Sequence, residues 1–145
     1  MPIRPDRVRV GMHTSLLASD WTREAAELAI PEAAEHGLEV LEVALLNPAI
    51  VDAPHSRKLF EKHGVEPTAS LCLPMEVTAP LHPDKAIAFL MPALDKAHEL
   101  GCSILCGVTY STLGWKSGAR PTDAEYANMV KALKPSPGRR ASTAC

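Results

Sequence analysis

The sequence predicts an α/β fold built on a parallel β-sheet. Segments typical of strands alternate with segments typical of helices four times along residues 7–133. Such alternation implies crossover connections, which set neighbouring strands parallel. The run LEVLEVALL at 38–46 is almost continuously apolar, as expected of a strand buried on both faces of a parallel sheet. The glycines Gly37, Gly64 and Gly101 follow three of the predicted helices, where glycine commonly ends a helix.

The first unit consists of a strand within 7–17 and a helix within 19–37. In the strand segment RVRVGMHTSLL, valines alternate with arginines before small residues begin a loop. Ser19 or Asp20 is expected to cap the helix. Pro31 lies inside it and is expected to kink it or split it in two.

The other three units repeat this order. Their strands are expected at 38–46, 65–75 and 102–111, and their helices at 52–64, 82–101 and 121–133. Thr122 is the expected cap of the last helix, and Glu125 follows it at the spacing of a capping box.

Two architectures fit four such units. One is a small doubly wound sheet that is complete in itself, and the other is half of an eightfold barrel, which usually needs about 250 residues. No Walker-type loop is present, and no glycine-rich dinucleotide fingerprint follows the first strand segment. Nucleotide binding by a doubly wound domain is therefore disfavoured.

The amino-acid composition limits the kinds of binding partner and the cellular compartment that can be expected. The net charge of -2 and the 4% aromatic content disfavour nucleic-acid binding. No apolar run approaches the ~20 residues of a membrane span, and the amino terminus lacks the apolar core of a signal peptide. Four cysteines without a compact framework favour a reducing compartment. We expect a cytoplasmic protein without nucleic-acid or membrane partners.

Candidate functional residues lie where the predicted strands end, because the working loops of parallel α/β folds follow those ends. His13 is a candidate hydrogen-bonding group or general base, or else a structural polar residue. Glu42 lies inside an apolar strand, where a carboxylate is costly unless it is paired or faces a polar site. Ser70 ends the third strand segment.

Four further residues of interest lie in the loops and the last strand segment. Trp21 and Trp115 are the only tryptophans, and each either walls a sugar pocket or is partly buried under its loop. Cys102 and Cys106 are expected on one side of the fourth strand. Because no second ligand pair accompanies them, we expect small buried hydrophobic residues rather than a zinc site.

Three segments together resemble a known family: VGMHTSLLASDW at 10–21, GLEVLEVAL at 37–45 and LGCSILCGVTYSTLGW at 100–115. They resemble the opening half of D-tagatose/D-psicose 3-epimerase-type enzymes. These belong to the sugar phosphate isomerase/epimerase family of the xylose-isomerase-like TIM-barrel superfamily. The resemblance runs from about residue 8 to 133, and it implies that residues 1–134 form the amino-terminal half of such a barrel, with four βα units.

The resemblance also implies a chemistry. The family moves a proton beside a ketose carbonyl through an enediolate, with a divalent manganese, cobalt or magnesium ion. The positions that match its substrate pocket are His13, Trp21, Ser70 and Trp115, and Glu42 matches a strand glutamate near the pocket floor. His13 departs from the aromatic residue often found there, so the sugar itself is left open.

One departure from the family concerns its catalytic centre. Two glutamates, an aspartate and a histidine from the fifth to eighth strands hold the metal, and no Asp, Glu or His follows Leu133. The resemblance therefore implies a chain that carries part of the substrate pocket, lacks the metal ligands and is inactive alone.

The segment 135–145 is expected to be a disordered, frameshifted tail of a truncated enzyme, because it contains no acidic residue and no large aliphatic or aromatic residue. Two alternatives stay open: a non-catalytic half-barrel that binds a sugar or a partner, and an unrelated, complete small α/β domain. A half-barrel would leave unpaired strand edges and an uncovered apolar face, so self-association through the exposed sheet is expected.

Overall fold

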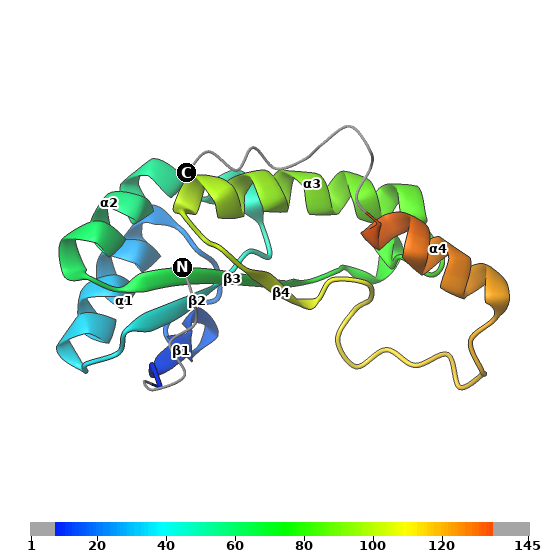
Figure 1. The fold of residues 1–145 in the computed structure, drawn as a ribbon, viewed down its shortest axis with the longest axis horizontal. Coiled ribbons are helices and arrows are strands. Elements are labelled where there is room, and N and C mark those ends of the chain that lie inside the picture. Colours follow the sequence, from blue (N-terminus) through cyan, green and yellow to red (C-terminus); the bar gives the residue numbers. More distant parts are fainter. Residues whose placement is uncertain (1–7, 135–145) are drawn as a thin grey trace. The chain divides into compact units, whose positions relative to one another are not determined.

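The computed structural model describes residues 8–134, which form four strands alternating with four α-helices (Figure 1). The strands are β1 (Gly11–His13), β2 (Val40–Ala44), β3 (Glu66–Cys72) and β4 (Leu105–Val108). The helices are α1 (Arg23–Glu35), α2 (Ala53–His63), α3 (Pro83–Leu100) and α4 (Asp123–Leu133). The predicted α/β order is confirmed, and the tail predicted at 135–145 lies outside the described residues.

The four strands form one sheet in the order β1-β2-β3-β4. β1 pairs with β2 and β2 with β3 in parallel. The spatial order therefore follows the chain, without the reversal that marks a doubly wound sheet. Sequential parallel strands linked by helices are the arrangement of a TIM-barrel segment.

The chain divides into two compact units, and each is described by itself. Unit 1 contains the described residues up to 71 together with 91–107, and unit 2 contains 72–90 together with the described residues from 108. The two units share α3, since its first half lies in unit 2 and its second half in unit 1.

The core of unit 1 lies between one face of the sheet and its helices. Leu41 and Val43 of β2 are fully buried there, as is Ala69 of β3. Small residues let α1 approach closely, and the helices contribute Ala26, Ala29, Ile30, Ala33, Phe60, Ala97 and Leu100 to this core. Burial of this apolar surface, at about 25 cal/mol per Å², holds the sheet against α1 and α2.

The opposite face of the sheet in unit 1 is polar. The prediction that 38–46 is buried on both faces is wrong, because Val40 and Glu42 are only half-buried while Leu41 and Val43 between them are enclosed. The expectation of an uncovered apolar face is wrong as well. This face carries the half-buried polar side chains of Glu42, Glu66 and Thr68.

Helix α1 begins later than predicted, and Pro31 does not split it. Its cap is Thr22, whose hydroxyl accepts a hydrogen bond from the Ala25 amide at 3.2 Å, rather than Ser19 or Asp20. Pro31 has no backbone N–H and therefore cannot donate a helical hydrogen bond to the carbonyl of Glu27. Because Glu27 is exposed, water can satisfy that carbonyl.

The last strand is shorter than predicted and closely paired. Gly107 has φ +99°, and a β-carbon there would lie 2.3 Å from the carbonyl oxygen of Leu71, so only glycine fits. Cys102 precedes β4 and packs half-buried against the core, whereas Cys106 lies within β4 and is exposed. The expectation that both are buried on one side of a strand is therefore wrong.

No helix in residues 8–134 is long and apolar enough to cross a membrane.

Candidate functional site

The polar face of unit 1 is organised in rows across the strands. In the registered pairing, His13 of β1 lies beside Glu42 of β2, and Glu42 lies beside Thr68 of β3. Side chains at paired positions of a parallel sheet point to the same face. One row across the three strands therefore presents an imidazole, a carboxylate and a hydroxyl.

His13 is held by the turn that follows β1. The side chain of buried Thr14 accepts a hydrogen bond from the Ala44 amide at 3.0 Å, which ties this turn to the end of β2. His13 itself caps the short 3-10 helix Thr14–Leu16, because its Nδ1 accepts the amide hydrogen of Ser15 at 3.1 Å. The Ser15 hydroxyl lies 2.7 Å from the same nitrogen.

These contacts determine which nitrogen of the neutral imidazole carries the hydrogen. Nδ1 accepts a backbone donor, so the hydrogen resides on Nε2. Nε2 lies 3.0 Å from the Ser70 Oγ and 3.8 Å from a carboxylate oxygen of Glu42. His13 is thus arranged as a hydrogen-bond donor toward the pocket.

The arrangement of Ser70, His13 and Glu42 differs from a hydrolytic triad. In a triad the serine and the carboxylate contact opposite ring nitrogens, so that one nitrogen takes the proton while the other is oriented. Here both groups face Nε2, and a backbone amide occupies Nδ1. The three groups suit binding of a polar ligand better than activation of the serine.

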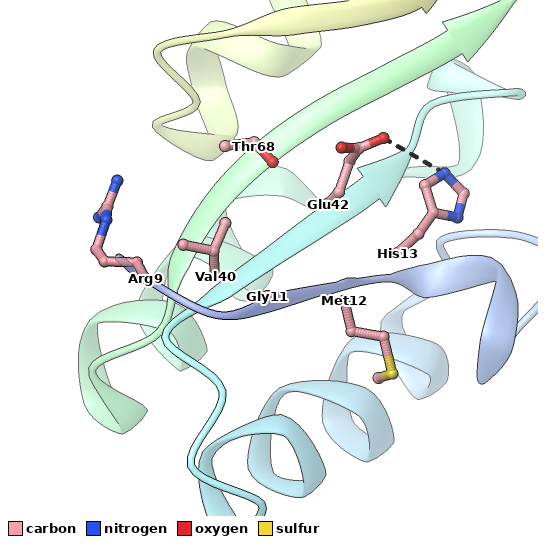
Figure 2. Close-up of a pocket in the computed structure, with 7 residues that line it drawn as sticks. All are labelled: Arg9, Gly11, Met12, His13, Val40, Glu42 and Thr68. Atoms are coloured by element: carbon pink, nitrogen blue, oxygen red, sulfur yellow. Dashed lines mark ion pairs between the residues drawn. The ribbon is translucent and has the colours of Figure 1, made fainter. Parts of the chain in front are cut away.

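A pocket of about 400 Å³ opens over this face of the sheet (Figure 2). Glu42 and His13 point toward one another in it, and Met12 points to the opposite side, toward the helices. Its lining consists of Arg9, Gly11, Met12, His13, Val40, Glu42 and Thr68. The volume lies in the range typical of small-ligand sites, about 300–1,000 Å³.

Gly11 and Arg9 shape the opposite end of the pocket. A β-carbon on Gly11 would lie 2.6 Å from the Val40 carbonyl oxygen, so a larger residue would push β1 away from β2. The guanidinium of Arg9 forms an ion pair with Glu66, which raises the pKa of Arg9. Since Glu66 already pairs with it, Arg9 acts as a wall of the pocket more than as a free anion-binding group.

Cys106 of β4 adds a thiol near Glu42. Partial burial raises the pKa of this thiol, and the neighbouring Glu42 carboxylate raises it further by charge and by accepting its hydrogen bond. A protonated thiol is a weak nucleophile and a poor metal ligand. Cys106 therefore acts as a donor to Glu42.

Trp21 lies in the core of unit 1 rather than in a pocket wall. Its side chain is 2% exposed, its ring stacks on Phe60 at 6.1 Å between centroids, and its Nε1–H donates to Ser56 at 3.1 Å. Of the two readings of this tryptophan, the structure supports burial.

Trp115 belongs to unit 2, where it lines a separate hollow of about 560 Å³. The lining also includes Tyr110, Tyr126 and Met129. Aromatic and apolar side chains thus dominate this hollow.

No group of three or more His, Cys, Asp or Glu side chains in residues 8–134 lies close enough to hold a metal ion. His13 and Glu42 are a pair with a thiol beside them, and the Cys106 thiol is held protonated. The described residues therefore do not fit the divalent metal centre that the resemblance implies for the family, and no step through a metal is derived.

The fold and the rows of polar side chains define the class of this chain. A sequentially ordered parallel sheet, covered by helices on one face of unit 1 and polar on the other, is a partial TIM barrel. In a closed barrel that polar face would line the interior.

Comparison with known proteins gives the particular group. No protein-family model matches the chain. The L-ribulose 3-epimerase of Methylomonas sp. (strain DH-1) is 34% identical over 135 residues, which cover 90% of this chain and 46% of that protein. The ketose 3-epimerase of Arthrobacter globiformis is 26% identical over 111 residues, covering 73% of this chain and 38% of that protein.

Solved structures agree. The crystal structure of a D-allulose 3-epimerase from Methylomonas sp. in complex with D-allulose has a TM-score of 0.77 and 32% identity, over 88% of this chain and 45% of that one. The chain is therefore a homologue of ketose 3-epimerases, which belong to the xylose-isomerase-like TIM-barrel superfamily. The matched region covers less than half of the length of each of these two relatives. The alternative of an unrelated small α/β domain is thereby removed.

Among the predicted site residues, the structure brings together His13, Glu42 and Ser70, while Trp21 lies in the core and Trp115 in the other unit. Sequence reasoning missed Thr68 and interpreted Cys106 as a buried hydrophobic residue. The period of two along each strand would have found Thr68, which lies two residues before Ser70. The contact of Cys106 with Glu42 required the strand pairing.

Proposed function

We propose that this chain forms the substrate-binding part of a ketose 3-epimerase-type site and binds a ketose on the polar face of unit 1. The observation that carries the proposal is the convergence of His13, Glu42 and Ser70, with the hydrogen of His13 directed to Nε2. Homology to ketose 3-epimerases supports the ligand class, and the relative solved with D-allulose supports a sugar of that kind.

Each group has a distinct part in this proposal. A ketose presents hydroxyls that both donate and accept hydrogen bonds, so it needs both kinds of partner. His13 would donate from Nε2 to a sugar oxygen, and Glu42 would accept from a hydroxyl. The hydroxyls of Ser70 and Thr68 can do either. The pocket volume of about 400 Å³ accommodates a monosaccharide.

The two tryptophans that were predicted to line the pocket have different roles in this proposal. We propose that Trp115 stacks on the C–H face of a sugar, in the hollow of unit 2. Trp21 supports the site only through the core, since its side chain is enclosed.

The proposal leaves out the acid–base and metal chemistry, because residues 8–134 contain no fitting ligand cluster. The second candidate, a non-catalytic half-barrel that binds a sugar, follows from the same observation. In this second candidate the chain binds the sugar without contributing to any catalytic site. A cytoplasmic location, one domain over residues 1–134 and the absence of nucleic-acid and membrane partners stay predictions.

Self-association through the exposed sheet also stays a prediction. It would depend on the edge strands β1 and β4 of the described sheet, because their outer backbone N–H and C=O groups can form hydrogen bonds with another chain. The polar face of the sheet gives little apolar surface for such contact.

D-allulose binding, followed by ¹H–¹⁵N NMR of the full chain, tests the proposal. We expect shift changes concentrated at residues 11–15, 40–44 and 66–70. His13→Ala should weaken binding by about three- to tenfold, the value of one lost hydrogen bond. His63→Ala, which removes an imidazole at the end of α2, is the matched control and should leave binding unchanged.

Absence of localised shift changes at high sugar concentration would refute ketose binding at this face. Equal loss in the His13 and His63 variants would show that the sugar contacts neither in a specific way.

A further inference from the structure

The carboxylate of Glu42 faces the pocket of unit 1 without a permanently charged cation beside it in residues 8–134. In that part of the chain its one ion-pair contact is with His13, whose Nε2 lies 3.8 Å from a carboxylate oxygen. This distance is too long for a hydrogen bond, and the contact is an ion pair only when the imidazole is protonated. The neutral ring of His13 therefore leaves the charge of Glu42 uncompensated.

The uncharged neighbours of Glu42 solvate its carboxylate only weakly. The Cys106 thiol donates a hydrogen bond to it, but a thiol is a weak donor. Thr68, the paired residue on β3, carries a hydroxyl and no charge. The side chain of Glu42 is 37% exposed, so a ligand in the pocket can reach the carboxylate.

The charge of Arg9 at the other end of the pocket is already compensated. Within the described residues, Arg9 is the one Lys or Arg side chain that lines this pocket. Its guanidinium forms an ion pair with Glu66, and the negative charge of Glu39 acts on it as well. Figure 2 shows Arg9 and Glu42 apart along the sheet. Glu42 is thus a negative charge in excess, and a cleft with an excess of one sign concentrates ligands of the opposite sign.

We propose that this pocket prefers an amino sugar, a ketose that carries a protonated amine, to the neutral ketose of the same skeleton. The ammonium group would donate a charge-assisted hydrogen bond to Glu42, which is stronger than the bond from a neutral hydroxyl. His13 would still donate from Nε2 to a sugar oxygen. The inference rests on the proposed ketose site and names the class of ligand that the charge of this site favours.

A matched pair of ligands tests the preference. D-fructose and 1-amino-1-deoxy-D-fructose differ in one position, where a hydroxyl is replaced by an amine that is protonated at neutral pH. Each is titrated into the full chain and followed by ¹H–¹⁵N NMR, with D-allulose as the reference for the ketose site. We expect the amine to bind about three- to tenfold more tightly than D-fructose, since solvent weakens a partly exposed ion pair.

Two carboxylate variants assign the preference to Glu42. Glu42→Gln keeps the size of the side chain and an acceptor oxygen but removes the charge, so the two ligands should bind about equally. Glu61→Gln removes one negative charge from the surface of α2, where Glu61 pairs with Arg57, and should leave the preference unchanged. Circular dichroism checks that both variants keep the fold.

Salt tests the same preference without any substitution. Raising the ionic strength from about 10 mM to about 1 M shortens the Debye length from about 30 Å to about 3 Å. The affinity for the amine should therefore fall several-fold, while the affinity for neutral D-fructose should stay nearly constant.

The outcomes separate this inference from the ketose-binding proposal. Equal affinities for D-fructose and its amine would overturn the charge preference and leave the ketose site intact. A preference that survives in Glu42→Gln, or that does not respond to salt, would overturn the role of Glu42. Localised binding of the amine without either neutral ketose would support the charge preference and refute ketose binding, and no binding of any ligand would overturn both.

Discussion

His13 shows how a local backbone contact decides the use of a side chain. Its Nδ1 is occupied by the Ser15 amide at 3.1 Å, so its neutral ring presents an N–H to the pocket. From the sequence it could equally have been a base. The cap of a three-residue helix, which no sequence pattern marks, makes it a donor.

The Glu42 carboxylate can be probed through its neighbour Cys106. Burial and then Glu42 raise the pKa of the Cys106 thiol. Glu42→Gln removes the charge but not the burial, so the pKa should fall partway toward its usual value. We expect faster alkylation of Cys106 by iodoacetamide at mildly alkaline pH, measured by peptide mass spectrometry.

Cys102 supplies the internal control for this measurement. Burial alone raises its pKa to about 12, so its slow alkylation should be the same with and without the Glu42 substitution. An unchanged rate at Cys106 would contradict the contact between the thiol and the carboxylate.

At the scale of elements, the helix boundaries follow local chemistry closely. The capping box at Thr122 and Glu125 is present in both directions, and the Asp52 side chain caps α2 by accepting a hydrogen bond from the His55 amide. Pro31 does not split α1, and Pro92 likewise lies within the continuous helix α3. Packing against the sheet outweighs the loss of one hydrogen bond in each helix.

The capping box also predicts a pH dependence. The Thr122 amide and then its hydroxyl lower the pKa of Glu125. A lowered folded-state pKa means that the stabilisation is complete above the unfolded value of about 4.3 and is lost as pH falls through the folded value. Glu125→Gln should therefore increase hydrogen exchange of α4 amides near neutral pH, and the difference from the parent should vanish in acid.

Asp123→Asn is the matched control, because it removes a first-turn charge without removing a cap bond. It should raise α4 exchange less than Glu125→Gln does. A Glu125 effect that persists unchanged in strong acid would contradict a role for the ionised carboxylate.

At the scale of the whole chain, homology and fold agree, while no group of three or more His, Cys, Asp or Glu side chains in residues 8–134 could hold a metal ion. Half the length of a ketose 3-epimerase suffices for four sequential strands and for a row of polar side chains on their face. The TIM barrel distributes its working residues over many strand ends, so a part of it can retain binding groups without the acid–base pair.

Metal addition tests this reading directly. A site occupied at about 100 times its dissociation constant stabilises a protein by about 2.7 kcal/mol, which raises Tm on the order of 5–10 °C for a chain of this size. We expect no such rise with manganese, cobalt or magnesium, and no ketose epimerisation, because residues 8–134 offer no three-ligand cluster. Calorimetry with and without a chelator measures it, and a clear rise in Tm would overturn the expectation.

The sequence by itself determined the α/β order, the carboxyl ends of α1, α2 and α3 and the family resemblance, because periodicity and glycine stops act over a few neighbouring residues. Three of its candidate residues, His13, Glu42 and Ser70, do converge. The turn geometry after β1 decided that His13 donates from Nε2. Only the tertiary structure decided that Trp21 is core and that one face of the sheet is polar. These depend on strand register and on which helix covers which face. Contacts between residues far apart in the chain set both, and no local pattern encodes them.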